Sequence, residues 1–156
     1  MIRTALSLAA LAASALLPAA AQVSATQAVL AETVTVDDQG RETVRTVPAT
    51  EVTPGDRIAY VLSYRNEGAA PADGLVLVMP VPGTVDLLVG TEAGGRADYS
   101  VDGGQTYAAL AELTVTGEDG RPRPAGGRDV THLRWRLEGA LPPGEAGEVS
   151  YRAVLR

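Results

Sequence analysis

The residues with the clearest chemical pattern lie in the stretch "YSVDGGQTYA". Its pattern is Ser-x-Asp-x-Gly-x-Thr-aromatic, formed by Ser100, Asp102, Gly104, Thr106 and Tyr107. A carboxylate can act as a general acid or base, but an aspartate in such a loop also accepts hydrogen bonds from the backbone of its own turn. The hydroxyls can bond locally, glycine allows positive φ, and the aromatic ring can pack beneath. We therefore predict a structural turn, with sugar contact or catalysis as the alternative.

Other residue types that could do chemistry form no recognisable constellation. The chain has no cysteine and a single histidine, His132, which leaves too few nitrogen and sulfur ligands for zinc. His132 lies between arginines on the outward side of a predicted strand, so we expect it to face solvent. A glycosidase needs two carboxyls at a set separation, and no spacing among the 19 acidic residues singles out a pair. The acidic turns at 36–40 and 117–120 lack EF-hand spacing, which favours solvated turns over calcium sites. No metal or cofactor is predicted.

Arginines gather at the outward positions of two predicted strands. Residues 131–137 place Arg134 and Arg136 on one face, and residues 148–155 place Arg152 on the outward face. In Ig-like domains these two strands usually pair as neighbours, which would form one arginine-rich face. Guanidinium groups suit carboxylates and phosphates and are favoured at interfaces. These arginines therefore form either a binding patch or a solvated face on which acidic residues balance their charge.

The elements that must position these groups are short strands. After the first 22 residues, apolar residues alternate with a period of two between turns rich in Gly, Pro, Asp and Asn. Strands are predicted at residues 28–36, 42–49, 57–65, 75–80, 131–137 and 148–155, with shorter ones between, and the turn of Asp102 joins 96–101 to 105–109. Residues 117–129 form the longest predicted loop. This pattern predicts an all-β, Ig-like antiparallel sandwich of about seven to nine strands in one domain.

The same alternation predicts the core. Ile58, Tyr60, Leu62 and Tyr64 share one face of their strand, and Trp135 is the expected aromatic anchor on another. The segment 75–80 is apolar on both faces, so it is expected to be central or to be covered by the N-terminal segment.

The N-terminal residues have the pattern of a secretory signal peptide. One early charge, Arg3, precedes an apolar stretch at 5–17, then Pro18 and three alanines at 19–21. We predict a signal peptide at residues 1–21 and a single domain at residues 22–156. The apolar stretch is short for a bilayer of about 30 Å, so no membrane span is expected after cleavage, with a retained anchor as the alternative. A periplasmic or secreted location follows.

The sequence "VTPGDRIAYVLSYRNEG" resembles a known family. Its residues Pro54, Gly55, Asp56, Tyr60, Tyr64, Asn66 and Gly68 are similar to the opening motif of Ig-like repeat domains in bacterial envelope and surface proteins, the type once catalogued as domain of unknown function number eleven. "APADGLVLVMPVPGTV" and "LEGALPPGEAGEVSYRAVL" resemble later parts of that family, so the resemblance covers residues 28–156. It implies an Ig-like fold and an extracytoplasmic setting, and no catalytic residues. The chain departs from the family in holding one copy, and in lacking the Asp that often precedes the proline at Pro80.

The turn pattern resembles a second motif, the Asp-box of sialidases and other β-propellers. Those boxes occur several times and lie away from catalysis, whereas this chain has one copy and is too short for a propeller.

These observations together predict a non-enzymatic, structural or protein-interaction module of the bacterial cell envelope. Its partner would be another envelope or surface protein. The net charge of -6 argues against nucleic acid. The alternatives are a carbohydrate-binding accessory domain, whose weakness is the lack of an exposed aromatic platform, and a glycosidase-like hydrolase.

Overall fold

The chain forms strands joined by turns over nearly its whole described length. The computed structural model describes residues 22–36 and 38–156, so the predicted signal peptide lies outside the described residues. The strands are β1 (Val23–Val36), β2 (Glu42–Pro48), β3 (Arg57–Asn66), β4 (Val76–Pro80), β5 (Val85–Leu87), β6 (Ala97–Ser100), β7 (Thr114–Thr116), β8 (Pro122–Pro124), β9 (His132–Arg136) and β10 (Ala146–Leu155). Two single-turn helices occur at Leu110–Glu112 and Gly127–Asp129. The all-β prediction is confirmed.

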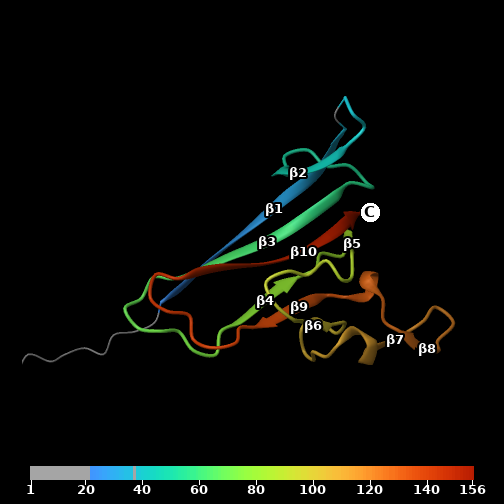
Figure 1. Ribbon diagram of the computed structural model, residues 1–156. Coiled ribbons are helices and arrows are strands. Elements are labelled where there is room, and N and C mark those ends of the chain that lie inside the picture. The colour runs from blue at the N-terminus through green and yellow to red at the C-terminus, as the bar shows by residue number, and fades with distance from the viewer. Residues whose placement is uncertain (1–21, 37) are drawn as a thin grey trace, which may run out of the picture.

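The strands form a five-stranded sheet and a three-stranded sheet, with a separate two-stranded ribbon (Figure 1). The larger sheet has the order β2-β1-β3-β10-β5, the smaller has the order β4-β9-β6, and β7 pairs with β8. All pairs are antiparallel. The structure has ten strands in its described residues, whereas seven to nine were predicted. One reason is that β8, which pairs with β7, lies within the predicted loop at 117–129.

One expected neighbour relation is wrong. Strand β9 lies between β4 and β6, whereas β10 lies between β3 and β5 in the other sheet. The chain changes sheets between them, because both long edges of β10 are occupied by strands from much earlier in the sequence.

The core fills the space between β3 and β10 on one side and β4 and β9 on the other. Tyr60 and Tyr151 lie opposite each other in register, and their rings stack with centroids 4.8 Å apart. The Tyr151 hydroxyl donates a 2.7 Å hydrogen bond to the carbonyl of Pro80, which ties the sheets together. Burial raises the pKa of both phenols, so they stay protonated donors. Leu133 and Trp135 are completely enclosed, as the alternation predicts.

Strand β4 differs from its expected setting. It forms an edge of the smaller sheet, with Leu77 and Met79 buried and with Val76 51% and Val78 44% exposed. The expectation of a central or covered strand is therefore wrong, because no element among residues 22–36 and 38–156 packs on its outward face.

A buried asparagine fixes the loops at one end of the sandwich. Asn66, the last residue of β3, is fully buried and donates through Nδ2 to the carbonyls of Ala70 (2.8 Å) and Leu141 (2.9 Å). Its Oδ1 accepts a 3.0 Å bond from the Gly68 N–H. One side chain thus holds the loop after β3 against the turn before β10, and its polar groups are satisfied as burial requires.

Candidate functional site

The turn at Asp102 uses its carboxylate within the turn itself. Oδ2 accepts a 2.6 Å bond from the Thr106 hydroxyl, and Oδ1 accepts from the Ser100 hydroxyl (2.7 Å) and from the Gln105 and Thr106 N–H groups (3.0 Å each). The Ser100 hydroxyl, itself buried, also accepts from the Gly104 N–H at 2.9 Å. These bonds, led by those from Thr106, hold the pKa of Asp102 well below its usual range. A carboxylate so engaged is a poor acid or base.

Two details of the turn differ from the expected hairpin. Strand β6 returns only through a single bridge, Tyr99 to Ala108, and not through a second strand at 105–109. The ring of Tyr107 lies over a guanidinium, that of Arg134, 4.2 Å from Cζ to the ring centroid.

Replacing Asp102 with Asn is expected to lower the melting temperature by several degrees at pH 7, because an amide cannot accept the full set of bonds. The folded-state pKa lies below the unfolded value of about 4, so this stabilisation is present above pH 4 and fades as the pH falls further. The difference between the two proteins should therefore shrink in acid. Thermal melts followed by circular dichroism from pH 2 to 7 measure this.

Asp119→Asn is the matched control, because Asp119 also sits in an acidic turn but Oδ1 accepts only the Arg121 N–H there. Equal decreases in melting temperature for the two variants would show that the hydrogen bonds of Asp102 contribute no more to stability than that of Asp119.

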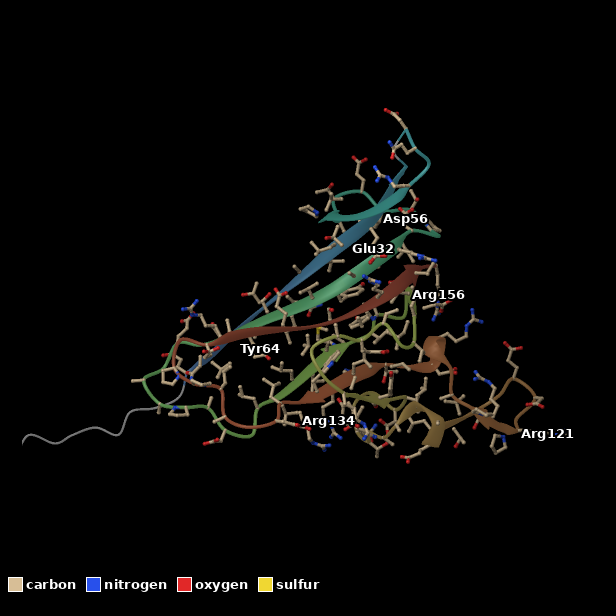
Figure 2. All side chains as sticks on the ribbon, in the orientation of Figure 1. Glu32, Asp56, Tyr64, Arg121, Arg134 and Arg156 are labelled. Atoms are coloured by element: carbon tan, nitrogen blue, oxygen red, sulfur yellow. The ribbon has the colours of Figure 1, made fainter. Side chains whose placement is uncertain are left out.

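The predicted arginine patch is divided between the two sheets. Arg134 and Arg136 lie on the outer face of β9 and share the Oδ2 atom of Asp98, at 2.9 and 3.0 Å. Arg152 lies on the outer face of the other sheet and forms an ion pair with Glu32 of β1, 2.6 Å from Nε to Oε1. Figure 2 shows Arg134 and Glu32 on opposite sheets. A single face containing all three arginines is therefore wrong.

The arginines that remain on β9 are not equivalent. The Arg134 side chain is largely enclosed between Asp98 and the Tyr107 ring, whereas the Arg136 side chain is 61% exposed. Of these two arginines, only Arg136 is exposed enough to contact a ligand without losing its present contacts. His132, predicted to face solvent, is only partly exposed, and its ring lies 3.3 Å from the Thr131 hydroxyl.

The most unusual surface is the part of the larger sheet that extends past the smaller one. In Figure 1, β1 and β2 continue beyond the region that β4, β9 and β6 cover. Val29 of β1 lies opposite Tyr60 of β3, so its side chain is on the face of the sheet where Tyr60 is buried. Val29 is nonetheless 38% exposed. Val47 of β2, opposite Ala31, is 41% exposed on the same face. We call this strip of Val29, Ala31 and Val47 the uncovered face.

Among the described residues, no strand pairs with the outer backbone edge of β2. The Ala49 N–H bonds to the Val29 carbonyl at 3.2 Å, which sets the phase of the β1–β2 ladder. Odd-numbered residues of β2 therefore bond to β1, and Glu42, Val44 and Thr46 direct their N–H and C=O groups outward. Pro48 also directs its backbone outward, but proline has no N–H to donate. Its carbonyl already accepts a 2.9 Å hydrogen bond from the Thr50 N–H. The open edge thus spans residues 42–46.

Sequence reasoning missed the first part of this feature. Strand β1 starts at Val23, whereas the alternation predicts a start at residue 28, because residues 24–27 are small or polar. Which face lies uncovered depends on the extent of the second sheet, and no local pattern reports that.

Comparison with known proteins gives no relative. No family model, curated protein or solved structure matches the chain. The resemblance to Ig-like envelope repeats therefore remains a prediction from the motifs. Within the described residues, no helix has the length and apolar character of a membrane span, and the His, Asp and Glu residues of that part form no cluster of three or more suited to a metal.

Proposed function

We propose that this domain is a non-enzymatic, Ig-like interaction module of the bacterial cell envelope that binds an extended segment of another envelope protein. The segment would add as a strand to β2. The observation that carries the proposal is the open edge at 42–46, which adjoins the uncovered face at Val47.

The chemistry of this surface defines the partner. An added strand would form main-chain hydrogen bonds with the outward groups of Val44 and Thr46, and such bonds supply affinity in strand addition. Its alternate side chains would lie beside Val47 and extend the uncovered face. The expected partner segment is therefore extended, free of proline in its centre, and apolar at every second residue.

Two carboxylates with chemically suggestive positions are already engaged within the protein, which favours a binding function over catalysis by either of them. Asp102 is engaged by its own turn, and Asp98 is shared by two arginines. The envelope location follows from the signal peptide predicted for residues 1–21.

The proposal predicts that Val44→Pro abolishes partner binding while the domain stays folded. Proline removes one outward N–H from the edge and leaves the bonds of β2 to β1 in place, because Val44 is out of phase with that ladder. A photoreactive amino acid at Val47 should crosslink one envelope protein in living cells, through a segment with alternating apolar residues found by mass spectrometry. The Val44→Pro change should remove that adduct.

The control places the photoreactive residue at Val89, an exposed valine outside the uncovered face. An adduct at Val47 that persists in Val44→Pro protein of unchanged melting temperature would exclude strand addition. The same adduct from Val89 would show that the capture is not specific to β2.

A further inference from the structure

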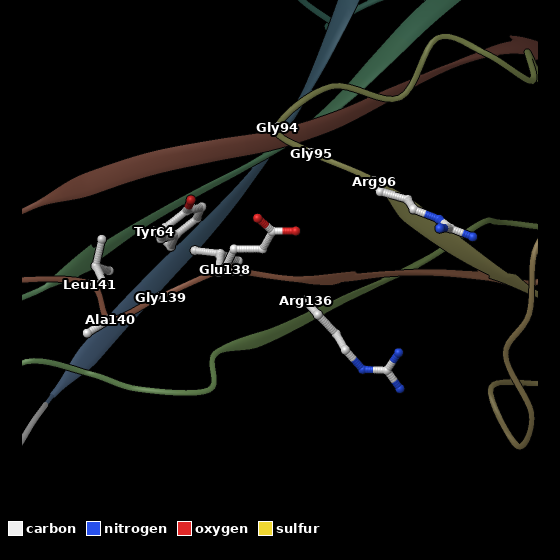
Figure 3. A pocket seen from close by; sticks show the side chains of 10 residues that line it. Tyr64, Gly94, Gly95, Arg96, Arg136, Glu138, Gly139, Ala140 and Leu141 are labelled. Carbon is white, nitrogen blue, oxygen red and sulfur yellow. The ribbon is translucent and has the colours of Figure 1, made fainter.

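A cleft of about 450 Å³ lies at the end of the sandwich where the chain leaves β9 (Figure 3). Its walls are Tyr64 of β3, the glycine pair Gly94 and Gly95, and the residues that follow β9 from Arg136 to Leu141, with Arg96 at one end. This volume is within the range of small-ligand sites. The cleft lies near Tyr64, whereas the turn between β1 and β2 lies toward Asp56 at the other end of the larger sheet (Figure 2).

Tyr64 provides an aromatic wall held in a fixed position. It lies opposite Gly147 of β10 in register, and a Cβ built on Gly147 would collide with the Tyr64 ring, including Oη and Cζ. The ring therefore lies against the backbone of Gly147, and cross-strand packing of an aromatic side chain over glycine stabilises such a pair. Because Tyr64 also lines the cleft, the ring is available to a ligand without rearrangement.

Two charged groups at the cleft are unpaired within the described part of the chain. Across the described residues, neither Arg96 nor Glu138 forms an ion pair or a side-chain hydrogen bond, although both line the cleft. Arg136 stands at the same end as Arg96 and is bound on one side only, to Asp98. Figure 3 shows Glu138 between Tyr64 and these two arginines. Along the cleft, an aromatic ring is therefore followed by a carboxylate and then by two guanidinium groups.

We propose that this cleft binds an acidic saccharide. A pyranose ring packs well on a tyrosine because one of its faces carries C–H groups, and the hydroxyls of the sugar can donate to the Glu138 carboxylate. A carboxylate on the same or the next sugar would pair with Arg96 and Arg136, since guanidinium forks match carboxylates. Gly95, where a Cβ would meet open space, keeps the facing wall free of a side chain, and Gly94 packs directly against the backbone of β10. This site is independent of the β2 edge.

The test is a calorimetric titration of the whole domain with trigalacturonate and, separately, with uncharged cellotriose. Trigalacturonate should bind, and cellotriose should bind at least about tenfold more weakly because it lacks the carboxylates. Arg96→Gln should weaken trigalacturonate by about tenfold and leave cellotriose unchanged. Tyr64→Leu, which keeps an apolar side chain over Gly147, should weaken both.

Arg121→Gln is the matched control, because Arg121 is exposed and lies at the opposite end of the molecule from Tyr64 (Figure 2). This variant should bind as the wild type does. Melting temperatures of all variants separate lost binding from lost folding. Absence of trigalacturonate binding at millimolar concentration, or equal binding by wild type and Arg96→Gln, would overturn the proposal. Tighter binding of a triglutamate peptide than of trigalacturonate would overturn it too, by assigning the cleft to peptides.

Discussion

Asn66→Asp is expected to destabilise the domain by about 3 kcal/mol or more at pH 7, although the two side chains have nearly the same shape. The change turns the Nδ2 donor into an acceptor that faces the carbonyls of Ala70 and Leu141. Each buried acceptor that loses its donor costs about 1–3 kcal/mol, and the buried charge adds to this. Urea unfolding followed by circular dichroism measures the loss.

The pH dependence of this variant separates hydrogen bonding from packing. Burial beside two carbonyls should raise the folded-state pKa of the new carboxyl above its unfolded value. The protonated form is then favoured in the folded state and can donate one bond, so the deficit should be smaller at pH 4 than at pH 7. Asn66→Ala has no titrating group and should show the same deficit at both. A deficit in Asn66→Asp that is small or independent of pH would contradict the role assigned to Asn66.

Trp135→Ala is the second change with a large expected effect, a loss of about 3–5 kcal/mol in the free energy of unfolding. Trp135 is 1% exposed and packs in the middle of the core between the two sheets. Because the whole stability of a domain is about 5–15 kcal/mol, this variant should be largely unfolded in moderate urea. It is the only tryptophan, so the transition is followed by far-ultraviolet circular dichroism.

Trp135→Phe is the comparison variant. Its ring fills part of the same space and removes the indole N–H, which is buried without a hydrogen-bond partner among the described residues. It should therefore lose less than about half as much stability as Trp135→Ala. Similar losses in the two variants would show that the volume of the side chain is not what matters, and a loss below about 1 kcal/mol for Trp135→Ala would contradict its central place in the core.

The strands and their inward faces could be predicted because the alternation of apolar and polar residues is a local signal. Ile58 and Tyr60 on β3 and Trp135 on β9 lie in the core in the phase that their spacing indicates. The hydrogen bonds at Asp102 join residues no more than four apart, so a short pattern is enough to anticipate them.

The pairing of strands could not be predicted in the same way. Whether β10 lies beside β9 or beside β3 depends on contacts between residues far apart in sequence, such as Tyr60 and Tyr151. The prediction of a single arginine-rich face required β10 to lie beside β9, so it is wrong for the same reason. The cleft was missed for the same reason, because its aromatic wall depends on Tyr64 lying opposite Gly147.

The position of β10 also sets the order in which the domain can become stable. This strand lies in the interior of the larger sheet, with β3 on one edge and β5 on the other. Until residues 146–155 leave the ribosome, β3 and β5 have no common partner and the aromatic stack of Tyr60 with Tyr151 cannot form. Such a dependence on distant contacts slows folding, so the domain should not become stable until residues 146–155 have been synthesised. The signal peptide predicted at residues 1–21 would direct export, and this arrangement would give the chain time to cross the membrane before it folds.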